Sequence, residues 1–106
     1  MDNFKVMYKI LKALEGSMDL EEFDTEQISP KVLEVSEERW THYLEMLSEE
    51  GLVKGVAIKA WVTGTKDVDI ENIKITMKGL QYLEENSMMK KIAAIAKGIK
   101  DTVPGL

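Results

Sequence analysis

Residues 75–87, ITMKGLQYLEENS, decide the fold because a strand gives way to a helix within them. Ile73 and Ile75 alternate with a polar residue, the period-two pattern of a half-buried strand. Thr76 then offers a side-chain oxygen that can cap the first turn of a helix. Gly79 lies inside that helix, where glycine costs about 1 kcal/mol relative to alanine. We therefore expect another stretch of backbone to approach the chain at Gly79.

Asn86 and Ser87 predict the end of this helix, with Ser87 capping a second one over residues 88–103. That second helix is amphipathic. Its apolar stripe is Ile92, Ile95, Ala96, Ile99 and Val103, surrounded by Lys90, Lys91, Lys97 and Lys100. Pro104 and Gly105 end it.

Upstream, the sequence predicts a helix over residues 3–15 with an apolar stripe at i, i+3, i+4 and i+7, formed by Met7, Ile10, Leu11 and Leu14. Gly16 and Ser17 end it. An irregular acidic connection follows over residues 17–29, and we expect it to be anchored to the core by Leu20, Phe23 and Ile28. Its carboxylates lack the spacing of a calcium-binding loop.

Ser29-Pro30 is a compact helix start, because serine caps and proline fits the first helical position. It opens a short helix over residues 30–34 that buries Val32 or Leu33. After a tight turn, Ser36 caps a longer helix over residues 37–50. The apolar stripe of this helix is Trp40, Tyr43, Leu44 and Leu47, and Gly51 stops it. Two helices joined by such a turn form a helix-turn-helix.

A β-hairpin is predicted next. Its first strand spans residues 52–62, with Leu52, Val56, Ile58, Ala60 and Val62 on one face. Residues 63–67 form the turn, and the second strand spans residues 68–75. The apolar parity of the second strand switches between Ile70 and Ile73, which indicates a bulge or bend near Glu71-Asn72.

The element order predicts an α+β fold. We interpret it as a winged helix-turn-helix with three helices, a two-stranded wing and a fourth helix, plus an extra C-terminal helix. We divide the chain into a winged-helix domain, residues 1–87, and a C-terminal amphipathic helix with a short tail, residues 88–106.

Two stretches together resemble a known family. ISPKVLEVSEERW at residues 28–40 and ITMKGLQYLEENS at residues 75–87, joined by a hairpin of this length, are similar to the YjcQ-like family of small bacterial and prophage proteins. The resemblance covers nearly the whole chain. It implies a winged-helix fold and a phage-related protein, and it carries over no catalytic or ligand residues.

Composition narrows the function classes. The chain has no cysteine and one histidine, His42. The absence of cysteine excludes thiolate chemistry. With one histidine, the sequence shows no set of residues that could form a metal site or a nucleophilic triad. We therefore expect no enzyme activity, no cofactor and no metal. The start of the chain lacks the basic and apolar regions of a signal peptide, so we expect a cytoplasmic protein.

Charge is unevenly distributed along the chain. Residues 1–50 hold five Lys/Arg and thirteen Asp/Glu, whereas residues 51–106 hold nine Lys and six Asp/Glu. The predicted third helix, residues 37–50, carries five glutamates and one arginine. Such a helix would be repelled by the phosphates of DNA. DNA binding is therefore possible but disfavoured, although a DNA-binding or regulatory module remains the leading hypothesis.

The candidate contacts with DNA or another partner are Arg39 and His42 on the third helix and Lys59, Trp61 and Lys66 on the wing. The alternative is a protein-interaction module whose acidic third helix does not bind DNA. The apolar stripe of the C-terminal helix predicts a homodimer contact through Ile92, Ile95, Ile99 and Val103. The alternatives for this segment are that it lies on its own domain, pairs with its copy, or sits against the acidic third helix of a neighbour. No aromatic residue follows Tyr82, so we do not expect membrane binding.

Overall fold

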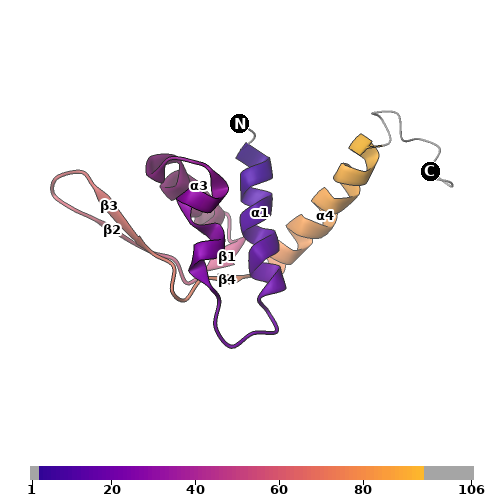
Figure 1. The fold of residues 1–106 in the computed structure, drawn as a ribbon, viewed down its shortest axis with the longest axis horizontal. Coiled ribbons are helices and arrows are strands. Elements are labelled where there is room, and N and C mark those ends of the chain that lie inside the picture. The colour runs from indigo at the N-terminus through magenta and orange to yellow at the C-terminus, as the bar shows by residue number, and fades with distance from the viewer. Residues whose placement is uncertain (1–2, 95–106) are drawn as a thin grey trace.

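The computed structural model describes residues 3–94, and for residues 87–94 it describes the backbone alone (Figure 1). The fold is α+β, as predicted. Its elements are α1 (Asn3–Gly16), the 3-10 helix η1 (Thr25–Ile28), α2 (Pro30–Leu33), α3 (Glu37–Glu49), β1 (Val53–Lys54), β2 (Ala57–Ala60), β3 (Lys66–Asp69), β4 (Lys74–Ile75) and α4 (Met77–Ala94).

The starts of α2 and α3 agree with the sequence because each has the predicted capping group. Ser29 Oγ accepts a hydrogen bond from the N–H of Val32, and Ser36 Oγ accepts one from the N–H of Arg39. At the other end of α3, the N–H groups of Gly51 and Leu52 donate to the carbonyls of Ser48 and Leu47. These two bonds form the closing motif that glycine favours after a helix.

The two predicted strands are each broken into two pieces, so the prediction of one continuous hairpin is wrong. β1 pairs with β4 and β2 pairs with β3, both antiparallel. The break on the first strand falls at Gly55, which has a φ of 82°. A Cβ at Gly55 would be closer to the carbonyl oxygen of Asn72 than real Cβ contacts allow. Asn72 lies in the turn that the parity switch predicted at Glu71-Asn72.

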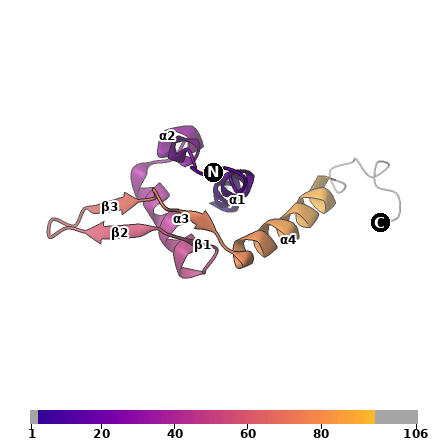
Figure 2. The same cartoon turned by 90° about the horizontal axis from the view of Figure 1, so that it is seen from below.

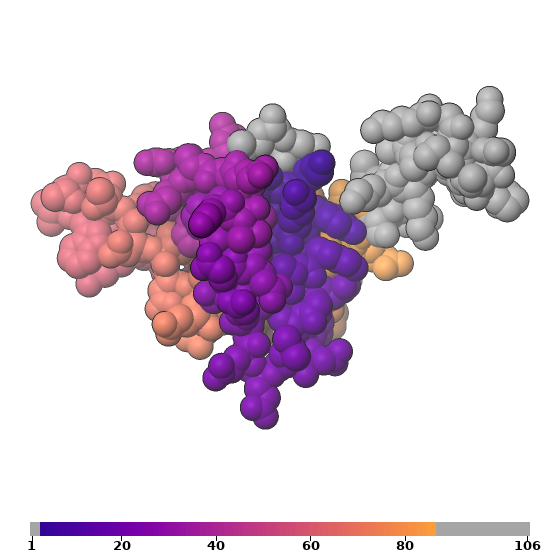
Figure 3. All heavy atoms as spheres, in the orientation of Figure 1, coloured from indigo at the N-terminus to yellow at the C-terminus, as the bar shows by residue number. Residues whose placement is uncertain are grey.

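Because of this break, the apolar face predicted for residues 52–62 is confirmed only in part: Leu52 and Val56 are half-buried against the core, but the rest of that face is exposed. Val53, on the opposite parity, is 2% exposed, whereas Ile58 is 37% exposed and Val62 is fully exposed. The hairpin β2–β3 stands out from the helical body, as Figure 3 shows. Figure 2 shows it pointing away from α4. Within β2 and β3 only Val68 is half-buried against the core, so most of the ribbon has no reason to bury one parity.

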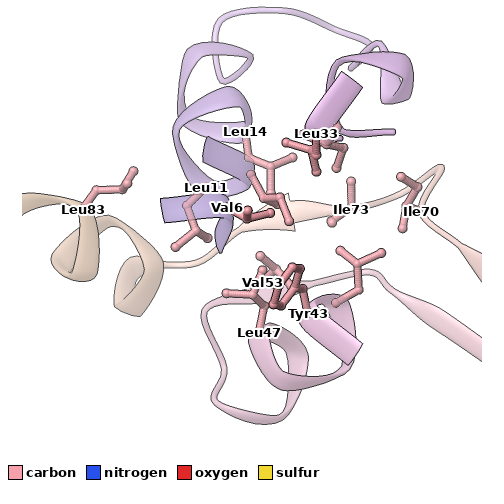
Figure 4. Close-up of a cluster of buried hydrophobic side chains, with 13 residues drawn as sticks. Val6, Leu11, Leu14, Leu33, Tyr43, Leu47, Val53, Ile70, Ile73 and Leu83 are labelled. Atoms are coloured by element: carbon pink, nitrogen blue, oxygen red, sulfur yellow. The ribbon is translucent and has the colours of Figure 1, made fainter. Parts of the chain in front are cut away.

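The core lies between α1, α3 and the short ladder β1–β4 (Figure 4). The predicted stripes supply most of it. Its buried side chains are Val6, Ile10, Leu11, Leu14, Ile28, Leu33, Tyr43, Leu44, Leu47, Val53, Ile70, Ile73 and Leu83. Leu33, not Val32, is the buried residue of α2. Leu20 is exposed and does not anchor the acidic connection, whereas Ile28 is fully buried.

The junction between β4 and α4 confirms the two roles predicted for it. Thr76 Oγ1 accepts from the N–H of Gly79 at 3.1 Å and donates to the carbonyl of Gly51. A Cβ on Gly79 would collide with the carbonyl oxygen of Leu52 and with the side chain of Ile75. Glycine is needed here because β1 passes directly beside the first turn of α4.

The predicted helix end at Asn86 and Ser87 is wrong, because α4 continues without a break to Ala94. The side-chain amide of Asn86 donates to the carbonyl of Tyr82 at 2.8 Å, so it is satisfied inside the helix instead of ending it. A separate helix starting at Met88 is therefore not formed. Of the four residues predicted as dimer contacts, Ile92 falls within α4. Ile95, Ile99 and Val103 lie outside the described residues.

Candidate interaction surfaces

Arg39 is held at the junction of α1 and α3. Its Nη1 donates to Asn3 Oδ1 at 2.9 Å and to the hydroxyl of Tyr43 at 3.5 Å. The hydroxyl of Tyr43 also donates to Asn3 Oδ1. Two side chains therefore share Asn3 Oδ1 as their acceptor, and the guanidinium that was predicted to reach a partner is directed toward its own protein.

His42 is exposed one turn further along α3. It lies on the edge of a shallow depression of about 350 Å³, lined by Asn3, Ser36, Glu38, Arg39, His42, Tyr43 and Met46. His42 and Arg39 are therefore brought together, as predicted, but Glu38 lies beside them. This part of α3 presents mixed charge instead of a basic face.

Lys59, Trp61 and Asp67 form one cluster on the hairpin. The indole Nε1 of Trp61 donates to Asp67 Oδ2 at 2.8 Å. The ammonium of Lys59 lies 4.3 Å from the centroid of the Trp61 ring, a cation–π contact. Lys59 is also paired with Asp67 across the ladder. The structure thus brings two predicted contact residues together, but it occupies one ring face of Trp61 and balances the charge of Lys59.

Lys66 is turned toward α3 and away from the cluster on the hairpin. Its Nζ lies 3.1 Å from both carboxylate oxygens of Glu45. The pair is partly exposed, at 42% for the Lys66 side chain and 23% for that of Glu45. Lys66 therefore offsets one negative charge of the acidic helix instead of offering its own charge to a partner.

Lys54 and Lys74 were missing from the predicted site. They lie opposite each other in the β1–β4 ladder, so their side chains leave the same face. Both are exposed, and neither has an ion-pair partner among the side chains that the structure describes. Only the register of the β1–β4 ladder places these two lysines opposite each other. The bend at Gly55 hides that register in the sequence.

An apolar groove lies where the N-terminal half of α1, the C-terminal half of α3 and the first turns of α4 meet. Its volume is about 400 Å³, and it is lined by Phe4, Met7, Met46, Leu47, Glu49, Glu50, Leu52, Lys78 and Tyr82. Phe4 is 66% exposed and Met46 is 43% exposed. The sequence predicted neither the groove nor these two side chains, because each lies just off the buried stripe of its helix.

Among residues 3–94, no three His, Cys, Asp or Glu side chains lie close enough to hold one metal ion. Within that range no helix has the length and apolarity to cross a bilayer.

These features define a class of small α+β protein, in which a helical body carries a projecting two-stranded hairpin. A comparison with family models assigns the chain more narrowly: the family described as YjcQ protein matches residues 8–102, so the chain belongs to that family. No curated protein and no solved structure matches the chain significantly.

Proposed function

We propose that the chain is a non-enzymatic, phage-related regulatory protein with a winged helix-turn-helix fold, and that it binds a basic protein partner through α3 and the hairpin. The fold part of the proposal is supported by the order of elements. α2 and α3 are joined by a short turn, and the antiparallel hairpin follows. α4 then begins directly after β4 of the β1–β4 ladder.

The charge of α3 supports a protein partner over DNA. Residues 37–50 carry Glu37, Glu38, Glu45, Glu49 and Glu50 against Arg39 alone. The cations predicted to meet a phosphate backbone are engaged within the protein. Arg39 donates to Asn3, and Lys66 pairs with Glu45. Counterion release from DNA needs free cations, and this face offers few of them.

Exposed apolar side chains next to the acidic helix support the same proposal. Trp61 is 46% exposed, Ile58 is 37% exposed, and Val62 at the end of the hairpin is fully exposed. Aromatic and aliphatic side chains beside charge are what protein interfaces use as anchors. The observation that carries the proposal is the Lys66–Glu45 pair, because it holds this ribbon against the acidic helix.

The experiment compares partner capture by three forms of the full chain: wild type, a double variant with Glu38→Lys and Glu45→Lys, and a control with Glu21→Lys and Glu22→Lys, which makes the same charge change at two exposed carboxylates between α1 and η1. Captured proteins are cross-linked and the linked positions are mapped. We expect lysine-rich partner segments linked to α3 and the hairpin, lost in the double variant and retained in the control. Circular dichroism shows that each variant folds. If the double variant keeps every captured partner, the acidic helix is not the interface.

DNA binding is the second candidate function, and Lys54 opposite Lys74 favours it. Two like charges held side by side repel each other, and an anion placed between them would relieve the repulsion. Fluorescence anisotropy of a labelled duplex at about 50 mM salt tests this candidate, because electrostatic binding is strongest there. Binding that falls steeply with salt and is lost in Lys54→Glu with Lys74→Glu would replace the protein-partner proposal with a DNA-binding one.

A further inference from the structure

We infer that the apolar groove between α1, α3 and α4 is the docking site for the C-terminal segment of a second copy of the chain, residues 88–103. The inference does not rest on the proposed function. It concerns a groove lined by the C-terminal end of α3, and it names a partner that the sequence itself supplies.

The chemistry of the groove fits this segment. The walls are apolar, from Phe4, Met7, Met46, Leu52 and Tyr82, and the rim holds two exposed carboxylates, Glu49 and Glu50, beside one cation, Lys78. The segment has an apolar stripe for the walls. Residues 88–103 also contain four lysines and one aspartate for the acidic rim. An amphipathic helix in a hydrophobic groove is a common mode of recognition.

The direction of α4 indicates that the occupant comes from another copy. Tyr82 lines the groove, and α4 continues from there to Ala94, about 18 Å further at ~1.5 Å per residue. Figures 1 and 2 show α4 leading away from the helical body. The chain beyond Ala94 would have to reverse to reach its own groove, whereas it can enter a neighbour's groove without reversing.

Reciprocal docking limits the assembly to two chains. If each copy places its segment in the groove of the other, a two-fold axis relates the two contacts and doubles the buried apolar area. A tail that docks in a groove differs in a testable way from two tails that pair with each other. Tail-in-groove docking needs one intact groove and one intact tail, which can come from different chains.

The test is sedimentation equilibrium of the full chain over a concentration series. We expect the mass of two chains at high concentration. The dimer should dissociate at least about tenfold more readily in Met46→Asp, which alters the groove, and in Ile95→Asp with Ile99→Asp, which alters the tail. Val62→Asp, at the exposed end of the hairpin, is the matched control and should leave the dimer unchanged. Neither Met46 nor Val62 belongs to the buried core of the described residues.

Mixing the groove variant with the tail variant gives the decisive result. One intact groove and one intact tail should restore a heterodimer of intermediate affinity. The inference is overturned if the wild-type chain stays monomeric at about 1 mM. It is also overturned if Met46→Asp leaves the dimer intact, or if the mixture does not associate. These outcomes are read from the mass of the assembly, whereas the proposal for Glu38 and Glu45 is tested by partner capture, so the two can fail separately.

Discussion

Lys66 on β3 and Glu45 on α3 are 21 positions apart in the chain, and their side chains form the ion pair that ties the hairpin to the helical body. The side-chain hydrogen bonds described for Trp61 stay within the hairpin. The orientation of the ribbon relative to α3 therefore depends on a partly exposed, salt-sensitive contact.

A double-mutant cycle with Glu45→Gln and Lys66→Met should give a coupling free energy below about 1 kcal/mol, because exposed ion pairs contribute little to unfolding. The orientation of the hairpin should nevertheless change. Residual dipolar couplings of the amides in β2 and β3, measured against those of α1, would report it. Unchanged couplings in Lys66→Met would show that the ribbon is held by other contacts.

Gly79→Ala should destabilise the protein by about 2 kcal/mol, although alanine is the better helix former. The added Cβ has to displace the carbonyl of Leu52 and the side chain of Ile75. Gly16→Ala is the matched control, since nothing lies within 4 Å of a Cβ there. That change should stabilise by about 0.5 kcal/mol. Chemical denaturation measures both, and equal effects of the two changes would contradict the close approach of β1 to α4.

Lys54→Glu should stabilise the protein by about 0.5 kcal/mol at low salt, because it places a carboxylate opposite Lys74 in the β1–β4 ladder. Lys59→Glu provides a control of opposite sign, since it places a carboxylate opposite Asp67. Thermal unfolding at low and high salt measures the change in stability that each of the two variants causes. The gain from Lys54→Glu should disappear at about 1 M salt, where the Debye length is near 3 Å.

Glu34→Gly should stabilise the protein by about 1 kcal/mol. Glu34 ends α2 with a φ of 59°, a left-handed conformation that costs a residue with a Cβ free energy and costs glycine almost none. Glu34→Ala keeps the Cβ and should give no such gain. If both changes have the same effect on the unfolding midpoint, the side chain of Glu34, and not its backbone, sets the energetics of the turn.

Local chemistry made much of the fold predictable. Ser29, Ser36 and Thr76 cap helices as expected, because one hydroxyl satisfies a backbone N–H wherever the rest of the chain goes. Gly79 was predictable as well, since glycine in a helix needs a packing reason. Asn86 and Ser87 misled because a capping residue is also tolerated within a helix when its side chain is satisfied there, as the Asn86 amide is by Tyr82.

The site was harder to predict because it depends on contacts distant in sequence. The residues Arg39, His42, Lys59, Trp61 and Lys66 were selected for charge or ring type, and all are exposed. Their partners were not predictable from spacing. Asn3 and Asp67 hold two of them, and Glu45 holds a third. The predicted apolar face did not include Val53, because the bend at Gly55 shifts the parity of the residues before it.

The bend at Gly55 also separates the part of the chain that forms the core from a part that does not. The core closes at Val53, Ile70 and Ile73, and the ladder β2–β3 beyond the bend adds no fully buried side chain. Insertions or deletions at the distal end, around Gly64, would therefore leave folding of the body untouched. A change in the length of this ribbon would alter how far it reaches from the body without rebuilding the rest of the molecule.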